Sequence, residues 1–229
     1  MPAGTPRRAL AATVVTAVVL VVLLGVVIRY GLVRSFDAWI SAGATRYGRD
    51  HAGWTTAAWW VTQLGGHLAA LAILVPLLVW LGVARRWLAA GYAAVAVLTT
   101  GPLVELVKHL VRRPRPDPTA PFAHFAGLSF PSGHSAHAAA EVLVLWILLL
   151  PLLAARGRRA VASAITVGVV VVLAVGWSRI ALGAHYPTDV LAGSALGAAW
   201  AAGTAWLGVG LSMRGQSRQN RSQGQSADR

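Results

Sequence analysis

The sequence predicts an all-α membrane protein with six transmembrane helices and short interfacial helices between the first and the second. Two observations lead to this fold class. The 229 residues are 56% hydrophobic and only 12% charged, and a soluble domain of this length needs more polar residues to cover its core. The apolar residues are also gathered in long uncharged runs, and a helix needs about 20 such residues to cross a bilayer. We therefore expect one membrane domain over residues 1–211.

The first expected span begins after Arg7 and Arg8. Its apolar run is longer than the core of a signal peptide and no Ala-x-Ala cleavage site follows it, so we expect it to be retained. The mixed segment after it contains Trp39, Trp54, Trp59 and Trp60, a density typical of short helices in the membrane interface. The six spans are expected at residues 9–28, 68–84, 87–106, 134–155, 160–177 and 190–211, with a kink at Gly101-Pro102 in the third.

The distribution of arginine predicts the orientation in the membrane. An even number of spans places both termini on one side, and the two short connections on that side are arginine clusters, namely Arg85-Arg86 and then Arg156, Arg158 and Arg159. Because short basic loops stay in the cytoplasm, we expect cytoplasmic termini in a multi-pass protein of the cell membrane. Residues 212–229 are mostly Ser, Gln, Arg and Gly with little to bury, so a disordered basic cytoplasmic tail is expected.

Composition also limits the partners and the chemistry. The chain has 20 Lys and Arg residues against 7 Asp and Glu, a formal net charge of +13. The basic residues lie between apolar runs and do not line one polar domain, which favours anionic lipid headgroups over nucleic acid as partners. The absence of cysteine excludes disulfides, thiolate metal sites and a cysteine nucleophile. The pattern does not set an oligomeric state.

The connection between the third and fourth spans, residues 108–134, is basic and broken by prolines. Lys108 is the only lysine of the chain, and Arg115 follows it within the same connection. A charge beside hydrocarbon costs free energy unless it is paired or used, and an ammonium together with a planar guanidinium can hold phosphate oxygens. The cluster indicates either a phosphate site or simple contact with lipid headgroups. Glu105, one helical turn before Lys108, is placed to pair with it.

The fourth span opens with Ser132-Gly133-His134. Ser132 is a good N-cap, the free amides of a first helical turn attract anions, and Gly133 lets phosphate oxygens come close. His134 is placed to donate a proton to a leaving oxygen. His137 and Glu141 lie on roughly the same helical face, where a functional role and a hydrogen bond between helices are both open.

A third polar group stands before the sixth span, where Arg179 precedes His185 and Asp189. A carboxylate four residues after a histidine, across the start of a helix, can reach the ring nitrogen that does not react. That contact fixes the tautomer and leaves the other nitrogen with a free lone pair, the arrangement of a histidine nucleophile. The alternation of spans places all three polar groups at the same membrane face.

Together these groups resemble the three-part signature of the type 2 phosphatidic acid phosphatase superfamily. The matching residues are Lys108 with six residues before Arg115-Pro116, then Pro131-Ser132-Gly133-His134, then Ser178-Arg179 with five residues before His185 and three more before Asp189. The resemblance covers these motifs and the six-helix layout.

The resemblance implies a role for each matching residue. His185 would attack phosphorus to form a phosphohistidine, with Asp189 orienting its ring. His134 would protonate the leaving group and then activate water. The remaining signature residues would surround the phosphoryl oxygens: Lys108, Arg115, Ser132, Gly133 and Arg179.

The predicted function is hydrolysis of a lipid phosphate or lipid diphosphate at the outer face of the membrane, without a metal or other cofactor. Phosphoryl transfer depends mostly on positioning and electrostatic stabilisation, and three cations can supply what Mg²⁺ supplies elsewhere. Polyprenyl diphosphate, phosphatidylglycerophosphate and phosphatidate all fit the pattern. Two other functions stay open: a phosphotransferase that uses a lipid or sugar hydroxyl as acceptor, and a non-catalytic lipid-binding or transport protein.

Overall fold

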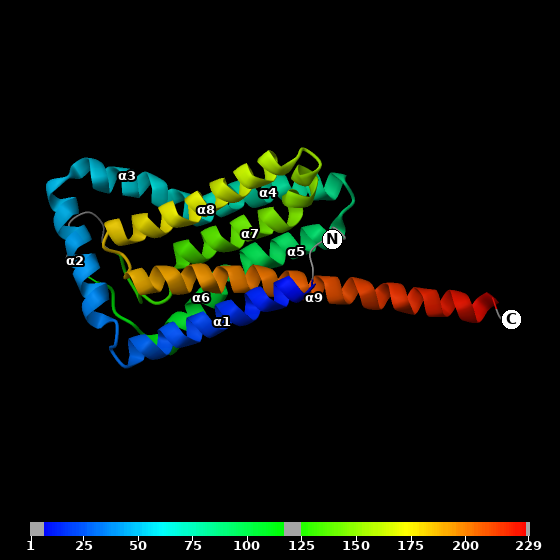
Figure 1. The fold of residues 1–229 in the computed structure, drawn as a ribbon, viewed down its shortest axis with the longest axis horizontal. Helices are drawn as coiled ribbons and strands as arrows, with labels where there is room; N and C mark the ends of the chain where they lie inside the picture. Colours follow the sequence, from blue (N-terminus) through cyan, green and yellow to red (C-terminus); the bar gives the residue numbers. More distant parts are fainter. Residues whose placement is uncertain (1–6, 117–124, 228–229) are drawn as a thin grey trace.

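The computed structural model describes residues 7–116 and 125–227, and within them every regular element is a helix. The elements are α1 (Arg7–Arg29), α2 (Arg34–Asp50), α3 (Ala52–Thr62), η1 (Gln63–Gly65), α4 (His67–Val83), α5 (Trp87–Leu98), α6 (Thr100–Val111), α7 (Gly133–Ala154), α8 (Arg158–Ala181) and α9 (Pro187–Ala227). Helix α9 runs along the bundle and packs against both α1 and α7 (Figure 1). The prediction of an all-α fold is confirmed.

Five stretches of helix are long and apolar enough to cross a membrane. They are Arg8–Arg29, Trp87–Val111, Gly133–Ala154, Arg158–Ala181 and Pro187–Gly208. The second expected span, residues 68–84, coincides with α4, whose 17 residues are short for a bilayer. It reaches span length only together with α3, from which it is bent by 40°, because Gly66 adopts an extended conformation between the two helices. The chain is therefore a multi-pass membrane protein whose described residues hold five spans, or six if the bent pair counts as one.

The third span is interrupted close to the predicted kink. It is divided into α5 and α6 at Thr99, slightly before the Gly101-Pro102 pair. Pro102 has no N–H to donate to the carbonyl group four residues earlier, that of Leu98. The missing bond falls where α5 ends, so the break lies on the N-terminal side of the proline.

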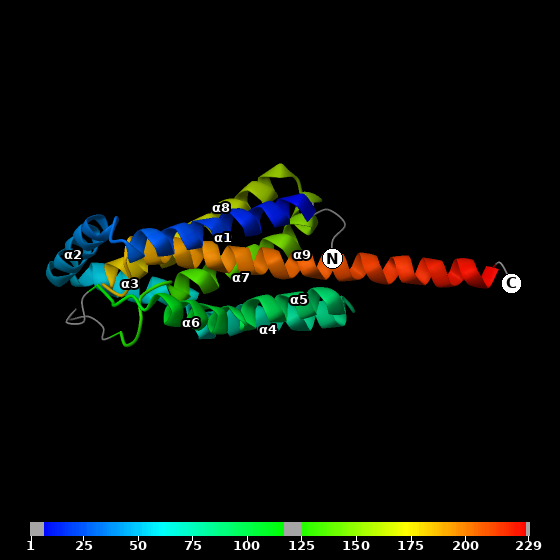
Figure 2. The same ribbon diagram turned by 90° about the horizontal axis from the view of Figure 1, so that it is seen from below.

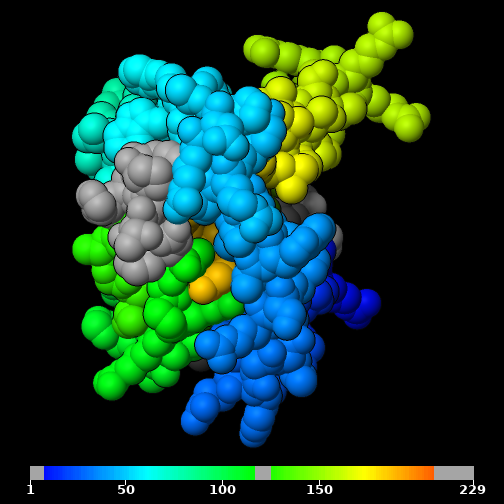
Figure 3. All heavy atoms as spheres, turned by 90° about the vertical axis from the view of Figure 1, so that its left-hand side faces the viewer, coloured from blue at the N-terminus to red at the C-terminus, as the bar shows by residue number. Residues whose placement is uncertain are grey.

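The two ends of the bundle differ in character. Helix α2 lies across one end of the bundle, and α3 leads from its far end toward α4 (Figures 1 and 3), which confirms the short helices expected between the first spans. The α6–α7 connection and the α8–α9 turn reach that same end, here called the motif end. The arginine-rich connections α4–α5 and α7–α8 lie at the opposite end with the start of α1 (Figures 1 and 2).

Helix α9 extends past the bundle to Ala227 (Figure 2). Disorder was expected from residue 212 onward, and here the structure differs from the sequence-based prediction. Helical hydrogen bonds join residues four apart, so an existing helix can continue without any tertiary contact. A domain boundary at residue 211 and a cytoplasmic tail stay predictions.

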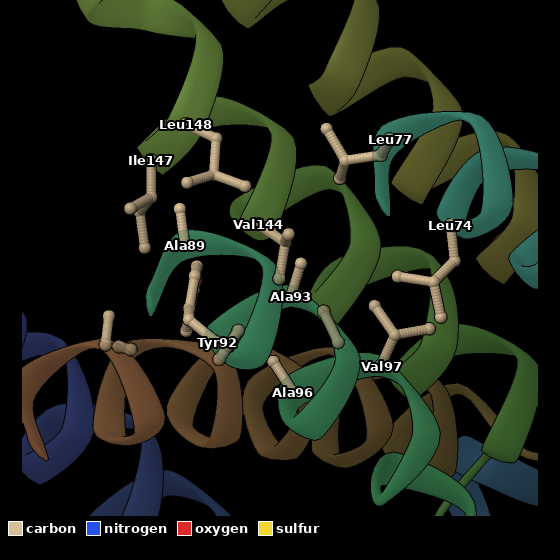
Figure 4. Packing of buried hydrophobic residues seen from close by; sticks show 14 of the residues in the cluster. Leu74, Leu77, Ala89, Tyr92, Ala93, Ala96, Val97, Val144, Ile147 and Leu148 are labelled. Carbon is tan, nitrogen blue, oxygen red and sulfur yellow. The ribbon is translucent and has the colours of Figure 1, made fainter. Parts of the chain in front are cut away.

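A cluster of buried apolar side chains joins α4, α5, α7 and α9 between the two ends. Leu74 of α4, Ala93 and Val97 of α5 and Val144 of α7 belong to it (Figure 4). Lipid tails are as apolar as these side chains, so close van der Waals packing holds such helices together more than expulsion from water does. The many alanines of the cluster allow the helix axes to approach closely.

The contact between α7 and α9 positions the motif end. Gly193 and Gly197, one turn apart on α9, lie directly against the backbone of Ser132 and Ala136 on α7. A Cβ atom on either glycine would overlap the facing carbonyl oxygen. This spacing of small residues is typical of closely packed membrane helices. It brings the first turns of the two helices together, and with them the second and third motifs.

We expect Gly197→Ala to force α7 and α9 apart, since the new methyl group would meet the Ala136 carbonyl oxygen. Overpacking of this kind costs about 1–3 kcal/mol, so the thermal unfolding temperature in detergent should fall by several degrees. Gly203→Ala is the matched control on the same helix, because its Cβ would have Val14 Cγ2 as the nearest atom, at 3.6 Å. Equal unfolding temperatures for the two variants would contradict this packing.

Candidate active site

A cavity of about 710 Å³ opens at the motif end between α3, α4, α6 and the first turn of α7. Six of the eight site residues expected from the sequence line it: Lys108, Arg115, Gly133, His134, Arg179 and His185. The remaining two, Ser132 and Asp189, are fully buried. Residues from all three sequence motifs therefore meet at one place, although the long helices α7 and α8 separate the third motif from the first two in the chain.

His185 lies on the turn between α8 and α9 and is 2% exposed. Its Nδ1 atom is 3.4 Å from Ser129 Oγ and 3.7 Å from Asp189 Oδ2. Ser129 Oγ donates a 2.5 Å hydrogen bond to the same Asp189 oxygen. That oxygen also accepts the backbone N–H of Tyr186, which holds the carboxylate against the start of α9. His185 Nδ1 therefore faces the carboxylate that the sequence predicted as its partner, and the Ser129 hydroxyl lies beside this pair and contacts both.

Arg115 determines which nitrogen of His185 accepts a hydrogen bond. Its Nη1 atom lies 3.3 Å from His185 Nε2. A guanidinium group has donors and no acceptor, so Nε2 must be the acceptor in this contact. In the neutral ring the hydrogen is then on Nδ1, facing Ser129. Nε2 is therefore unprotonated and carries the lone pair that a nucleophile needs, which in this structure accepts the hydrogen bond from Arg115.

The surroundings of His185 also set its charge. Its pKa is lowered from 6.5 to about 4, chiefly by burial and also by the guanidinium groups of Arg179 and Arg115, while Asp189 opposes the shift. Desolvation disfavours the charged imidazolium, and nearby cations disfavour it as well. The ring is therefore neutral near pH 7.

Asp189 is held by a second buried carboxylate through a shared cation. Arg113 Nη1 is 2.6 Å from Asp189 Oδ1, and Arg113 Nη2 is 2.6 Å from Asp37 Oδ2. Both carboxylates have zero exposed surface. Thr188 donates a 2.5 Å hydrogen bond to Asp37, and the ring of Tyr186 lies 3.9 Å from the Arg113 guanidinium carbon. This network ties α2, the segment after α6 and the start of α9 into one unit.

The two arginines that line the cavity pack on an aromatic ring. The guanidinium carbons of Arg179 and Arg115 lie 4.6 and 5.7 Å from the ring centre of Phe125. Arg179 Nη1 donates to Thr62 Oγ1 at 2.8 Å, while its buried Nε–H has no hydrogen-bond partner within the described part of the chain. Arg115 also donates to the carbonyl oxygen of Ala126. Such fixed cations are suited to hold phosphoryl oxygens.

The other predicted residues have simpler surroundings. Lys108 forms the expected ion pair with Glu105, with 2.7 Å between Nζ and Oε1. Ser132 is the N-cap of α7, since its Oγ accepts the Ser135 N–H and the Ser135 hydroxyl. Its hydroxyl is thus already engaged, and a direct role for Ser132 in phosphate binding stays a prediction. Gly133 lines the cavity at the beginning of α7.

Sequence reasoning missed Ser129, Arg113, Asp37 and Phe125. Asp37 had a recognisable signal, because the chain has only seven acidic residues and one of them stands near the expected interface. Arg113 stands two residues before the signature residue Arg115, and the sequence assigned it no role in the site. Ser129 and Phe125 carry no signal outside the folded structure. Among the described residues, no group of three His, Asp or Glu side chains is placed to hold a metal ion.

Comparisons with known proteins agree on one family. The PAP2 superfamily matches residues 87–211. Phosphatidylglycerophosphatase B of Bacillus subtilis is 38% identical over 137 residues, which are 57% of this chain and 66% of that protein. Decaprenylphosphoryl-5-phosphoribose phosphatase of Mycobacterium tuberculosis is 38% identical over 50% of this chain and 56% of its own length. Lipid A 1-phosphatase of Rhizobium johnstonii is 39% identical over 49% and 44%.

A solved structure extends the similarity to most of the fold. The transmembrane PAP2-type phosphatidylglycerolphosphate phosphatase from Bacillus subtilis aligns with a TM-score of 0.65 and 27% identity, covering 88% of this chain and 96% of the other. The sequence matches to the curated relatives, by contrast, span less than two thirds of those proteins' lengths.

Ser129→Ala should lower kcat by roughly tenfold to a hundredfold with little change in KM, because it removes the hydroxyl that contacts both His185 and Asp189 and leaves the cavity lining intact. Phosphate-release kinetics with a lipid phosphate measure both constants. Ser41→Ala is the control, since Ser41 is another buried serine and its hydroxyl has no hydrogen-bond partner within the described residues. Equal kcat values for the two variants would remove Ser129 from the site.

The neutral state of His185 should persist well into the acidic range. In protein labelled with ¹⁵N-histidine in detergent micelles, its ring nitrogens should keep the chemical shifts of a neutral ring down to about pH 5 and change near pH 4. A folded-state pKa below the unfolded value also means that this group costs stability as the pH falls from about 6.5 toward 4. The His185→Gln spectrum assigns the signal. Titration of that signal near pH 6.5 would contradict the burial argument.

Proposed function

Because this chain belongs to the PAP2 superfamily, we propose that it is a membrane phosphatase that hydrolyses a lipid phosphate or lipid diphosphate through a phosphohistidine. The observation that carries the proposal is the meeting of His185, His134 and three cations in one cavity. A buried neutral imidazole with an unprotonated Nε2 suits nucleophilic attack on phosphorus once Arg115 turns from that nitrogen to the phosphoryl oxygens. The curated relatives are themselves named as phosphatases.

The first chemical step transfers the phosphoryl group to the enzyme. His185 Nε2 attacks phosphorus, and the bond from phosphorus to the leaving oxygen breaks while His134 donates a proton to that oxygen. The Nδ1 hydrogen of His185 stays directed to Ser129, and Asp189 supports the positive charge that develops on the ring. In the second step His134 takes a proton from water, the water oxygen bonds to phosphorus, and the bond from phosphorus to Nε2 breaks to release inorganic phosphate.

Lys108, Arg115 and Arg179 stabilise the charge on the phosphoryl oxygens in both steps. All three line the cavity, and the two arginines are held in place by Phe125 and by hydrogen bonds to neighbouring groups. Preorganised cations of this kind provide the electrostatic stabilisation that phosphoryl transfer requires. We therefore propose that turnover needs no metal ion.

The surroundings of the cavity suggest a lipid substrate presented from the outer leaflet. The cavity lies at the motif end, opposite the arginine clusters Arg85-Arg86 and Arg158-Arg159. Short arginine-rich connections favour the cytoplasmic side, so the motif end would face outward. Trp59 at the rim of the cavity and the basic residues of this end are suited to the headgroup region and its anionic lipids.

Phosphate release from detergent-solubilised protein tests the proposal with phosphatidylglycerophosphate, phosphatidate and farnesyl diphosphate as substrates. His185→Gln should reduce release at least a thousandfold, because the nucleophile is lost. Wild-type protein quenched during turnover of ³²P-labelled substrate should contain label that is stable to base and released by acid.

EDTA should change the rate of phosphate release less than twofold. Substrate added outside right-side-out membrane vesicles should be hydrolysed.

His109→Gln is the matched control, since His109 is exposed on the last turn of α6 and outside the cavity lining. Near-normal release by His185→Gln in a folded protein would end the assignment, and loss of activity in EDTA that Mg²⁺ restores would end the metal-free mechanism. Addition of lipid or sugar acceptors separates hydrolysis from phosphotransfer, because a transferase would form a new phosphate ester at the expense of free phosphate.

A further inference from the structure

Three polar side chains beside the catalytic histidines have no part in the mechanism above. His67, His137 and Glu141 come from the first turn of α4 and from the second and third turns of α7. The ring centres of His67 and His137 are 5.1 Å apart, and His137 Nδ1 lies 3.9 Å from Glu141 Oε1. We call these three residues the inner polar cluster.

The inner polar cluster has unused hydrogen-bonding capacity. The side chains of His137 and Glu141 are only 9% and 4% exposed. Both ring nitrogens of His137 and Oε1 of Glu141 are buried without a hydrogen-bond partner among the residues that the structure describes. Buried polar atoms of this kind are uncommon in folded proteins and indicate a missing partner. Because His67 and His137 line the same cavity as His134 and His185, that partner can be part of the substrate.

The position of the cluster relates it to the leaving group. His137 follows His134 by one helical turn on α7, and a Cβ atom on Gly101 of α6 would lie 3.5 Å from His137 Nε2. The mechanism places the attacking His185 and the proton donor His134 on opposite sides of phosphorus. The leaving oxygen and the atoms beyond it therefore extend past His134, toward His137 and His67 and into the membrane domain.

Charged and uncharged side chains of the cavity suit different parts of the substrate. Lys108 stands two helical turns beyond Gly101 on α6, about 10 Å along the helix axis, and Arg115 contacts His185 directly. The cations thus lie around the phosphoryl position, while His67 and His137 present imidazole rings to the cavity. Neutral imidazole has one donor and one acceptor and suits a hydroxyl group, whereas a second phosphate beside these rings would lose its hydration without gaining a cation.

We propose that His67 and His137 of the inner polar cluster are a subsite for a hydroxyl group on the leaving alcohol. Glu141 lines a neighbouring cavity between α7 and α8 and acts on this subsite through His137. The preferred substrate is then a phosphomonoester of a hydroxylated lipid headgroup, such as a glycerol or a sugar, and lipid diphosphates are poorer substrates because their leaving group is a charged phosphate. This inference rests on the proposed phosphatase function and adds the chemical class of the substrate. It also gives His137 and Glu141 a role in selectivity, outside the catalytic step.

A matched pair of substrates tests the subsite in the full-length protein. Phosphatidylglycerophosphate has one free hydroxyl next to the leaving oxygen, and its 2′-deoxy analogue lacks only that group. Wild-type protein should show a kcat/KM roughly tenfold higher for the hydroxylated substrate, the factor expected for one hydrogen bond. Farnesyl diphosphate should be slower than both.

Variants identify the residues responsible. His137→Phe should lower kcat/KM for the hydroxylated substrate to that of the deoxy analogue and leave the analogue within twofold of wild type. His67→Leu, at the exposed rim, should reduce the same preference and serves as the second variant if His137→Phe unfolds. Tyr92→Phe is the control, because it removes another buried hydroxyl without a partner among the described residues, in the apolar cluster of α5.

The outcomes separate the two proposals. Equal kcat/KM values for the two substrates in the wild type, or equal losses on both in His137→Phe, would overturn the hydroxyl subsite while phosphate release itself stands. Failure of the wild type to release phosphate from any substrate would overturn the proposed function and this inference with it.

Discussion

A single guanidinium group between two buried carboxylates organises the motif end of this protein. Arg113 holds Asp37 of α2 on one side and Asp189 of α9 on the other, each at 2.6 Å. Removing one member of such a buried network leaves an uncompensated charge, which typically costs about 3–5 kcal/mol. The three segments are therefore constrained to one arrangement. That arrangement fixes Asp189, through it Ser129, and through both the ring of His185.

Close packing in the rest of the bundle brings the segments of this network within hydrogen-bonding distance. Gly193 and Gly197 allow α9 to lie directly on the first turns of α7, and the alanine-rich cluster of α4, α5 and α7 keeps those helices closely packed. Membrane helices gain little free energy from burying apolar surface against each other. Their positions are therefore determined by how well the helix surfaces fit together. Packing and chemistry are separated along the bundle axis, with the apolar cluster between the ends and the polar groups at the motif end.

Charge is graded within the cavity. Lys108, Arg115 and Arg179 line the cavity together with the imidazole rings of His67 and His137. A charged phosphate is stable only where cations replace its hydration. In the proposed mechanism the phosphate therefore binds at the three cations, and the lipid-bearing alcohol extends toward the helices.

The sequence by itself determined the helical spans, the end of the bundle at which the motifs meet and six of the residues that line the cavity, because apolar runs and motif spacing are local features of the chain. It also indicated the pairing of Lys108 with Glu105, which are one helical turn apart. Only the tertiary structure decided that Ser129 contacts both His185 and Asp189, that Arg113 reaches Asp37, and that Phe125 supports two arginines. These contacts join residues up to 76 positions apart, and their geometry depends on how closely α7 and α9 pack, which no local pattern of residues specifies.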